Sequence, residues 1–171
     1  MLVAYDPHWN DLYGAAASDL HRHGDSNWPI EHIGSTSVPG LAAKPIIDLA
    51  VCVDDTASLD DRSGALEKTG WLSLAAGPPD HAVRIKQSEA GVRTHIAHFF
   101  SPDQWNVCHQ RLFAARDHSD DRDRYARLKD SLLASGLAGR GYTAAKAAFV
   151  QEVVDRAAAA RGLPRILLNE E

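Results

Sequence analysis

A single carboxylate stands inside an apolar run of this sequence, at Asp48 in the stretch KPIIDLAVCV. If the run is a strand, alternation places Asp48 on one face with Ala50 and Cys52, and gives the other face to apolar side chains. An isolated carboxylate in apolar surroundings is strongly unfavourable unless it is paired, hydrogen-bonded or bound to a metal. The fold must therefore supply Asp48 with a partner.

Three kinds of partner are open to Asp48 at this point. The carboxylate can cap a neighbouring helix, form a structural ion pair with Lys44, Arg84 or Arg93, or bind a cation. The neighbour on its own strand face is Ala50, which is small, so we expect a ligand or metal to reach Asp48 on that side.

Composition and charge limit the class of protein. The 171 residues, 44% of them hydrophobic, suit one domain, and no apolar run approaches the roughly 20 residues of a membrane span. The net charge of -5 and pI near 6.0 argue against a nucleic-acid partner. With no secretory signal visible, we expect one cytoplasmic domain over residues 1–171, with neither a membrane nor a nucleic acid as partner.

The order of elements indicates an α+β or mixed α/β fold. Asp6 and Pro7 begin a first helix, and a second helix is expected from about Ala57 to Thr69, ending at Gly70. From Ser101 onward the pattern is helical, with Thr143 beginning the last helix. The strands are expected at Ile30 to Ile33, Ile46 to Val53, Trp71 to Leu74, His81 to Lys86 and Val92 to Phe100, and the last two form a hairpin.

The segment between the first two strands reads GSTSVPG and begins at Gly34. A glycine lets the backbone approach a ligand closely, and the hydroxyls and amides of Ser35, Thr36 and Ser37 are groups that hold phosphate oxygens. An ordinary Ser/Thr-rich turn is the alternative interpretation.

Four stretches together resemble the GrpB family, also called UPF0157, of the nucleotidyltransferase fold superfamily. They are IEHIGSTSVPGLAAKPIIDLAV, VRTHIAHFF, RYARLKDSL and GYTAAKAAFV, and the similarity runs from YDPHW near the start to about Val154. The resemblance implies a nucleotidyltransferase-like mixed sheet flanked by helices, with a helical C-terminal third. It also implies a cleft where the Gly-Ser turn meets the strand that carries the acid.

The resemblance further implies a triphosphate site at Gly34 and Ser35, with Asp48 as a Mg²⁺ ligand. Enzymes of this superfamily use a Gly-Ser pair for the triphosphate and two or three carboxylates for Mg²⁺, because hard cations choose oxygen ligands. This chain has Ala50 where the usual second acid falls. That departure weakens a two-metal mechanism.

Two histidines occupy the strand where related enzymes place a third acid and GrpB-like sequences place histidine. Strand alternation puts His95 and His98 on opposite faces, and His98 fits the family pattern better. Either imidazole can act as general base, phosphate ligand or metal partner of Asp48. A histidine hydrogen-bonded to backbone in the core or at the strand end is the alternative.

Phosphate groups also require cations. Lys44 precedes the strand of Asp48, and Lys146 follows Tyr142 near the start of the last helix, so we expect these three residues, with Thr36, to contact the nucleotide. Lys129 recurs in the family-like stretch, although surface pairing explains it nearly as well.

The resemblance favours an enzyme that binds ATP or another nucleoside triphosphate with Mg²⁺. Its reaction is nucleotidyl transfer to a small-molecule acceptor, or adenylation of a carboxylate followed by ligation to an amine. A noncatalytic nucleotide- or metabolite-binding module of the same fold is the alternative, and Ala50 is its main support.

Overall fold

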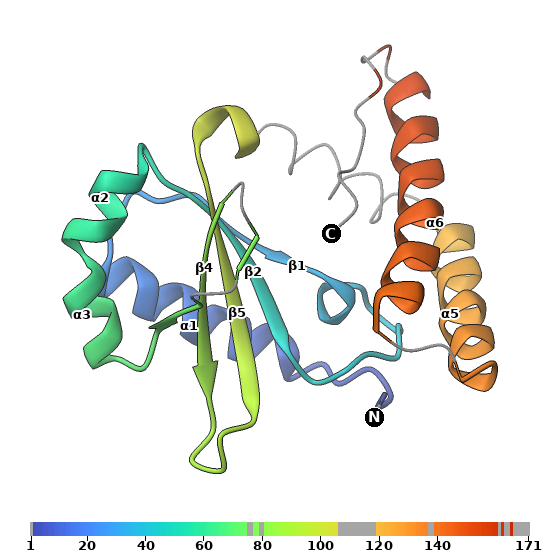
Figure 1. The fold of residues 1–171 in the computed structure, drawn as a ribbon, viewed down its shortest axis with the longest axis horizontal. Helices are drawn as coiled ribbons and strands as arrows, with labels where there is room; N and C mark the ends of the chain where they lie inside the picture. Colours follow the sequence, from blue (N-terminus) through green and yellow to red (C-terminus); the bar gives the residue numbers. More distant parts are fainter. Residues whose placement is uncertain are drawn as a thin grey trace. The chain divides into compact units, whose positions relative to one another are not determined.

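The computed structural model describes residues 2–74, 77–78, 81–105, 119–136, 139–160, 162 and 165 (Figure 1). Only the backbone is described at residues 56, 57, 119, 122, 133, 139, 140, 142, 143, 157 and 158. The chain forms two compact units, Met1–Asn106 and Val107–Glu171. No helix in the described ranges is long and apolar enough to cross a membrane.

The N-terminal unit is built on a five-stranded mixed sheet in the order β1-β2-β5-β4-β3. The central strands β2 and β5 are parallel, and the other neighbouring pairs are antiparallel. This is the mixed sheet that the sequence predicts. The strand bounds are β1 (Ile30–Ile33), β2 (Ile47–Cys52), β3 (Leu72–Ser73), β4 (Ala82–Gln87) and β5 (Arg93–Phe100).

Helices cover one face of this sheet. They are α1 (Trp9–His23), α2 (Thr56–Asp61) and α3 (Ser63–Lys68). Leu49 and Val51 of β2 and Phe99 of β5 point into the core on this face, where they meet Leu20 of α1 and Leu66 of α3. The predicted apolar face of β2 is confirmed.

The strand register decides which side chains share the opposite face. Asp48 pairs with Ile96 and Ala50 pairs with His98, so Asp48 and His98 lie on the same face, away from the core. The β4–β5 hairpin is confirmed, and Gly91 makes its turn with a φ of 73°.

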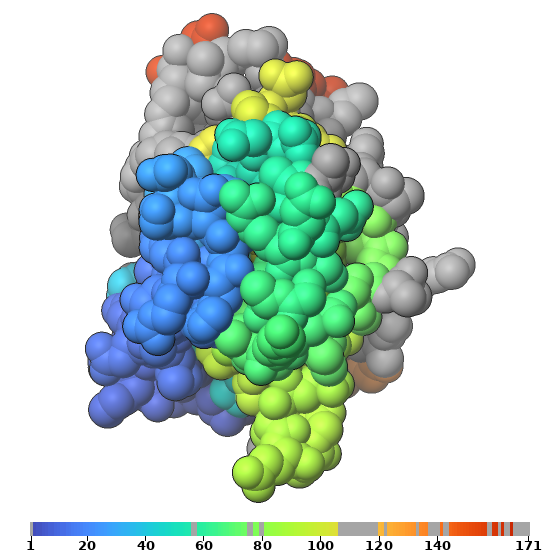
Figure 2. Space-filling view, turned by 90° about the vertical axis from the view of Figure 1, so that its left-hand side faces the viewer, coloured from blue at the N-terminus to red at the C-terminus, as the bar shows by residue number. Residues whose placement is uncertain are grey.

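Two predicted helices differ from the structure in their bounds. The first begins at Trp9, after a turn in which the Asp6 carboxylate accepts the His8 N–H at 3.0 Å. The expected helix from about residue 57 to 69 is divided at Arg62, whose guanidinium donates to Gly24 O and to the Asp25 carboxylate. Figure 2 shows the resulting α2–α3 pair, in green, beside the chain that follows α1, in blue.

The described helices of the C-terminal unit are α5 (Ser119–Ala134) and α6 (Gly139–Ala160). An ion network joins them, because Asp121 of α5 pairs with Arg124 and with Arg156 of α6, and Arg124 also pairs with Glu152. The helical C-terminal part agrees with the sequence prediction, although α6 begins four residues before Thr143. Residues 106–118 lie outside the described part.

A polar network ties α1 to the sheet beside the apolar core. Lys86 of β4 donates to the Asp19 carboxylate of α1 at 2.5 Å, and Trp71 Nε1 donates to the same carboxylate at 3.0 Å. Burial raises the pKa of Asp19, but the hydrogen bond and charge of Lys86 and the bond from Trp71 outweigh it, so the pKa lies below 3.8. The folded state therefore favours the ionised carboxylate.

We predict that Asp19→Asn lowers the free energy of unfolding at pH 7 by about 1.5–3 kcal/mol, because a charged hydrogen-bonded pair is lost. A depressed carboxyl pKa stabilises the fold above about pH 4, and this contribution disappears as the pH falls through the folded-state value. Urea unfolding from pH 7 to pH 2 should thus show a shallower acid decline in the variant. Asp11→Asn, an exposed change on α1, should alter stability by less than about 0.5 kcal/mol; an equal loss there would contradict this role of Asp19.

Candidate functional site

The turn after β1 places backbone directly against the Asp48 carboxylate. Gly34 has φ 72° and ψ -173°, a region open only to glycine, and the short 3-10 helix η1 (Ser35–Ser37) follows it. A Cβ atom at position 34 would lie 2.4 Å from Asp48 Oδ2. Position 34 requires glycine for two reasons. Its dihedral angles lie in a region that other residues do not adopt, and a side chain there would overlap the Asp48 carboxylate.

Internal hydrogen bonds hold this turn against the sheet. The Thr36 hydroxyl donates to Ile46 O at 3.2 Å and accepts from His32 Nε2 at 3.1 Å, which fixes the Nε2–H tautomer of His32. The His32 ring stacks on Tyr13 at a centroid distance of 4.8 Å, and Tyr13 donates to Ile30 O. This chain of contacts connects the turn to β1, to α1 and to the start of β2.

Thr36 and Ser37 therefore have structural tasks. Thr36 is buried, with 1% of its surface exposed, and its single hydroxyl hydrogen is donated to backbone. Ser37 Oγ donates to Gly34 O at 2.8 Å. Thr36 lies beneath the turn, where it orients Gly34 and Ser35. This buried position differs from the sequence prediction, in which Thr36 contacts the nucleotide. Ser35 is half-buried at the start of η1, beside Gly34.

The sheet brings one of the two predicted histidines to the face of Asp48. His98 pairs with Ala50 in the register, and on the other side Ala50 pairs with Glu31 of β1. Asp48 stands two residues before Ala50 on β2, so Glu31, Asp48 and His98 lie on the same face of the sheet as Ala50. The apolar side chains of Val83, Ile85 and Ile96 share this face. Ala50 itself is fully buried.

His95 lies on the opposite face, next to the core. Its ring makes an edge contact with Trp71 at 6.1 Å, and its Nδ1 is 2.9 Å from Thr94 Oγ1. Burial lowers the pKa of His95, and the positive charge of Lys86 lowers it further. The structure separates His95 from Asp48, so of the two predicted catalytic histidines only His98 lies on the site face.

A second histidine on the site face escaped the sequence analysis. His81, directly before β4, has its Nε2 atom 2.9 Å from His98 Nδ1, and its ring lies 4.5 Å from that of Phe100. The pairing depends on the hairpin register, which shifts at a bulge between Lys86 and Gln87. Strand periodicity alone does not reveal that shift.

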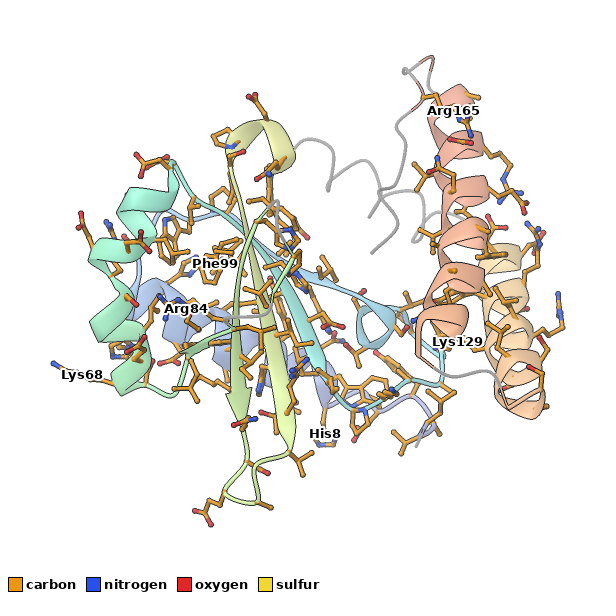
Figure 3. All side chains as sticks on the ribbon, viewed as in Figure 1. His8, Lys68, Arg84, Phe99, Lys129 and Arg165 are labelled. Atoms are coloured by element: carbon orange, nitrogen blue, oxygen red, sulfur yellow. The ribbon has the colours of Figure 1, made fainter. Side chains whose placement is uncertain are left out.

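The predicted cations occupy different places. Arg84 lies on the core face, where it donates to Trp71 O at 3.1 Å and to Ser63 Oγ at 2.6 Å, and Figure 3 shows it between the sheet and α3. An ion pair between Arg84 and Asp48 is thereby excluded. Lys44 is exposed three residues before β2.

The remaining predicted residues belong to α6 of the C-terminal unit. Lys146 is half-buried, and the side chain of Tyr142 lies outside the described part of the chain. Their contact with a nucleotide stays a prediction.

A metal ion at Asp48 would need ligands beyond the side chains. Among the described residues, no group of three or more His, Cys, Asp or Glu side chains is arranged to hold a metal. Mg²⁺ is commonly bound by one or two carboxylates, with water and substrate phosphates completing its octahedron. The carboxylate of Asp48, set against a glycine cradle that a Cβ atom would fill, fits that mode.

Comparison with known sequences places almost the whole chain in one group of proteins. The sequence model of the GrpB protein matches residues 1–156. A UPF0157 protein of Halalkalibacterium halodurans is 36% identical over 165 residues, which cover 91% of this chain and 81% of that protein.

Solved structures show the same fold. The crystal structure of the conserved protein GrpB from Enterococcus faecalis has a TM-score of 0.81 and 26% identity, covering 95% of this chain and 99% of that one. The Cid1 poly(U) polymerase bound to MgATP has a TM-score of 0.57 at 8% identity, covering 81% of this chain and 46% of that one. The second similarity establishes a nucleotidyltransferase-like fold and nothing finer.

We predict that Gly34→Ala destabilises the protein by about 2–4 kcal/mol, because the methyl group forces both a strained backbone and an overlap with Asp48. Gly40→Ala, which also has a positive φ but meets nothing within 4 Å, should cost about 1–2 kcal/mol. Thermal or urea unfolding measures both.

An Asp48→Ala background isolates the contact between the two residues. Removing the carboxylate oxygens should reduce the cost of Gly34→Ala, which a double-mutant cycle reports as a coupling energy. Equal costs in both backgrounds would show that the turn and the acid are independent.

Proposed function

The chain belongs to the GrpB family, and from this premise we propose that it binds a nucleoside triphosphate with Mg²⁺ and transfers the nucleotidyl group to a small-molecule acceptor. The observation that carries the proposal is the close approach of Gly34 to the Asp48 carboxylate. It puts a carboxylate that can bind a cation beside a turn that carries backbone amides and the Ser35 hydroxyl. The MgATP in the Cid1 structure supports the choice of ligand.

The two halves of this arrangement have complementary tasks. Gly34 and Ser35 offer a close backbone approach and a hydroxyl to the phosphate oxygens, while Asp48 holds the cation. When bound, Mg²⁺ would offset the negative charge that develops on the phosphates during transfer. Lys44, exposed beside β2, can add a positive charge to the same anion.

His98 is the proposed proton acceptor. The attacking oxygen or nitrogen of the acceptor forms a bond to the α-phosphorus, the bond to the pyrophosphate oxygen breaks, and His98 takes the proton that the acceptor loses. His81 orients this ring through the contact between His81 Nε2 and His98 Nδ1. Because the two nitrogens are 2.9 Å apart, one must carry the hydrogen and the other must accept it.

A ligase variant of the reaction uses the same site. A carboxylate acceptor would attack the α-phosphorus of ATP, release pyrophosphate and become an acyl-adenylate, which an amine then attacks with loss of AMP. Nucleotidyl transfer and this ligation share their first product, so pyrophosphate is the product to assay.

A noncatalytic nucleotide-binding module is the second candidate. The buried Ala50, at the position of the usual second acid, favours it, because one carboxylate binds fewer metal ions than two. The two candidates differ over Mg²⁺. A catalyst should bind ATP more tightly with the metal, whereas a degenerate module need not.

We predict that Asp48→Asn keeps the fold but weakens ATP binding in the presence of Mg²⁺ by at least about tenfold, or about 1.4 kcal/mol. The amide has nearly the shape of the carboxylate but lacks its charge. Calorimetric titration of ATP with and without Mg²⁺ measures the effect, and Ser35→Ala should weaken binding under both conditions.

Asp54→Asn serves as the matched control, since it removes the same charge from an exposed position beyond β2. It should bind Mg²⁺ and ATP as the unaltered protein does. Unchanged metal-dependent binding in Asp48→Asn would remove Asp48 from the cation site.

We also predict release of pyrophosphate when the protein, MgATP and a panel of small alcohols, amines and carboxylates are mixed. His98→Gln should slow the release by about 10²–10⁴-fold while leaving the affinity for MgATP unchanged, since it removes a proton acceptor and not a phosphate contact. His95→Gln, on the core face, is the comparison. Tight binding of ATP that is independent of Mg²⁺, without release across the panel, would favour the noncatalytic module.

A further inference from the structure

Two buried side chains join the Gly34 turn to the strand of Asp48. Thr36 of η1 and His32 of β1 expose 1% and 5% of their surfaces, and His32 Nε2 lies 3.1 Å from Thr36 Oγ1. The Thr36 hydroxyl donates to Ile46 O at 3.2 Å, directly before β2 begins. The His32–Thr36 pair therefore connects three segments: β1, the turn and the start of β2.

The single hydrogen of the Thr36 hydroxyl sets the direction of both bonds. Because that hydrogen is donated to Ile46 O, Thr36 must accept the bond from His32, and His32 Nε2 must carry a hydrogen. Both bonds therefore depend on the hydroxyl of residue 36, and the first also depends on an N–H from residue 32.

The ring of His32 is fixed in turn by α1. Tyr13 stacks on it with 7° between the ring planes and 4.8 Å between the ring centres, and the Tyr13 hydroxyl donates to Ile30 O at 2.9 Å. The helix also contacts both β1 and η1. A side chain held by packing and by hydrogen bonds in this way keeps its partner within a narrow geometry.

The pair spans the same two segments as the proposed nucleotide site. Thr36 follows Ser35, the proposed phosphate contact, by one residue, and Ile46 precedes Asp48, the proposed cation ligand, by two. A Mg²⁺ ion that binds both a phosphate oxygen and Asp48 needs a fixed separation between them, because its octahedron tolerates little distortion. The bond from Thr36 to Ile46 O restrains that separation.

We propose that His32 and Thr36 are positioning residues that couple the binding of triphosphate to the binding of Mg²⁺. The proposal rests on the proposed function and gives neither residue a contact with the ligand. With the pair intact, the turn and the carboxylate offer their ligands in register, so phosphate and cation each raise the affinity for the other. Without the pair both still bind, but each gains less from the other.

Calorimetric titration of ATP with and without Mg²⁺ measures this coupling as the ratio of the two affinities. Thr36→Val keeps nearly the shape of threonine without its hydroxyl, and it should lower the ratio at least about fivefold. Thr36→Ser retains the hydroxyl and should keep the ratio of the unaltered protein. His32→Leu should act like Thr36→Val, whereas His32→Gln, whose amide supplies an N–H, should recover part of the loss.

Thr69→Val is the matched control, because it removes the same kind of bond elsewhere in the N-terminal unit. The Thr69 hydroxyl donates to Leu66 O at 2.9 Å, at the end of α3. This variant should melt at a lower temperature than the unaltered protein and leave the ratio unchanged. A merely structural role of Thr36 would likewise change the melting temperature and not the ratio.

Amide hydrogen exchange tests the pair in the protein without ligand. The N–H groups of Ser37 and Val38 both donate to carbonyl groups within the turn, so they report on its opening. Their exchange should be faster in Thr36→Val and His32→Leu than in Thr36→Ser. Should Thr36→Val fail to fold, the two His32 variants make the same comparison.

Two results would overturn this proposal and leave the proposed function intact. They are an equal change of the ratio in Thr36→Val and Thr36→Ser, or turn amides that exchange in Thr36→Val as slowly as in the unaltered protein. ATP binding by the unaltered protein that does not depend on Mg²⁺ would overturn both proposals, so the two failures are distinguishable.

Discussion

The contact between the Gly34 backbone and the Asp48 carboxylate is the constraint on which the rest of the N-terminal unit depends. It requires a glycine with a positive φ, and it requires β1 and β2 to pair so that Ile33 lies opposite Asp48. The bonds from His32 to Thr36 and from Thr36 to Ile46 O then hold the turn in place. The Asp48 carboxylate, in an otherwise apolar strand, therefore packs against the backbone of the Gly34 turn.

The two faces of the sheet carry different groups of side chains. On one face, Leu49, Val51 and Phe99 pack under the helices and stabilise the fold. On the other, Asp48 and His98 share a face with Glu31 and His81, and with the apolar side chains of Val83, Ile85 and Ile96. A rigid sheet fixes such side chains more narrowly than a loop does, which suits the site that we propose for phosphate and cation.

Much of this arrangement could be predicted from the sequence, because it follows from local rules. Strand alternation gives the face of Asp48, and the Gly-Ser stretch gives the turn. The role of Thr36 and the contact between His81 and His98 could not be predicted, because each depends on a partner distant in sequence, and for the histidines on a bulge in the hairpin.

The most direct test of the account is where a divalent cation binds when ATP is present. Mn²⁺ can replace Mg²⁺ and broadens the NMR signals of nearby amides. In the protein saturated with ATP, the account predicts that substoichiometric Mn²⁺ broadens the amides of residues 33–37 and 47–49 first, and that Asp48→Asn abolishes this pattern. Broadening centred elsewhere, or an unchanged pattern in Asp48→Asn, would contradict the claim that the Gly34 turn and Asp48 form the cation site.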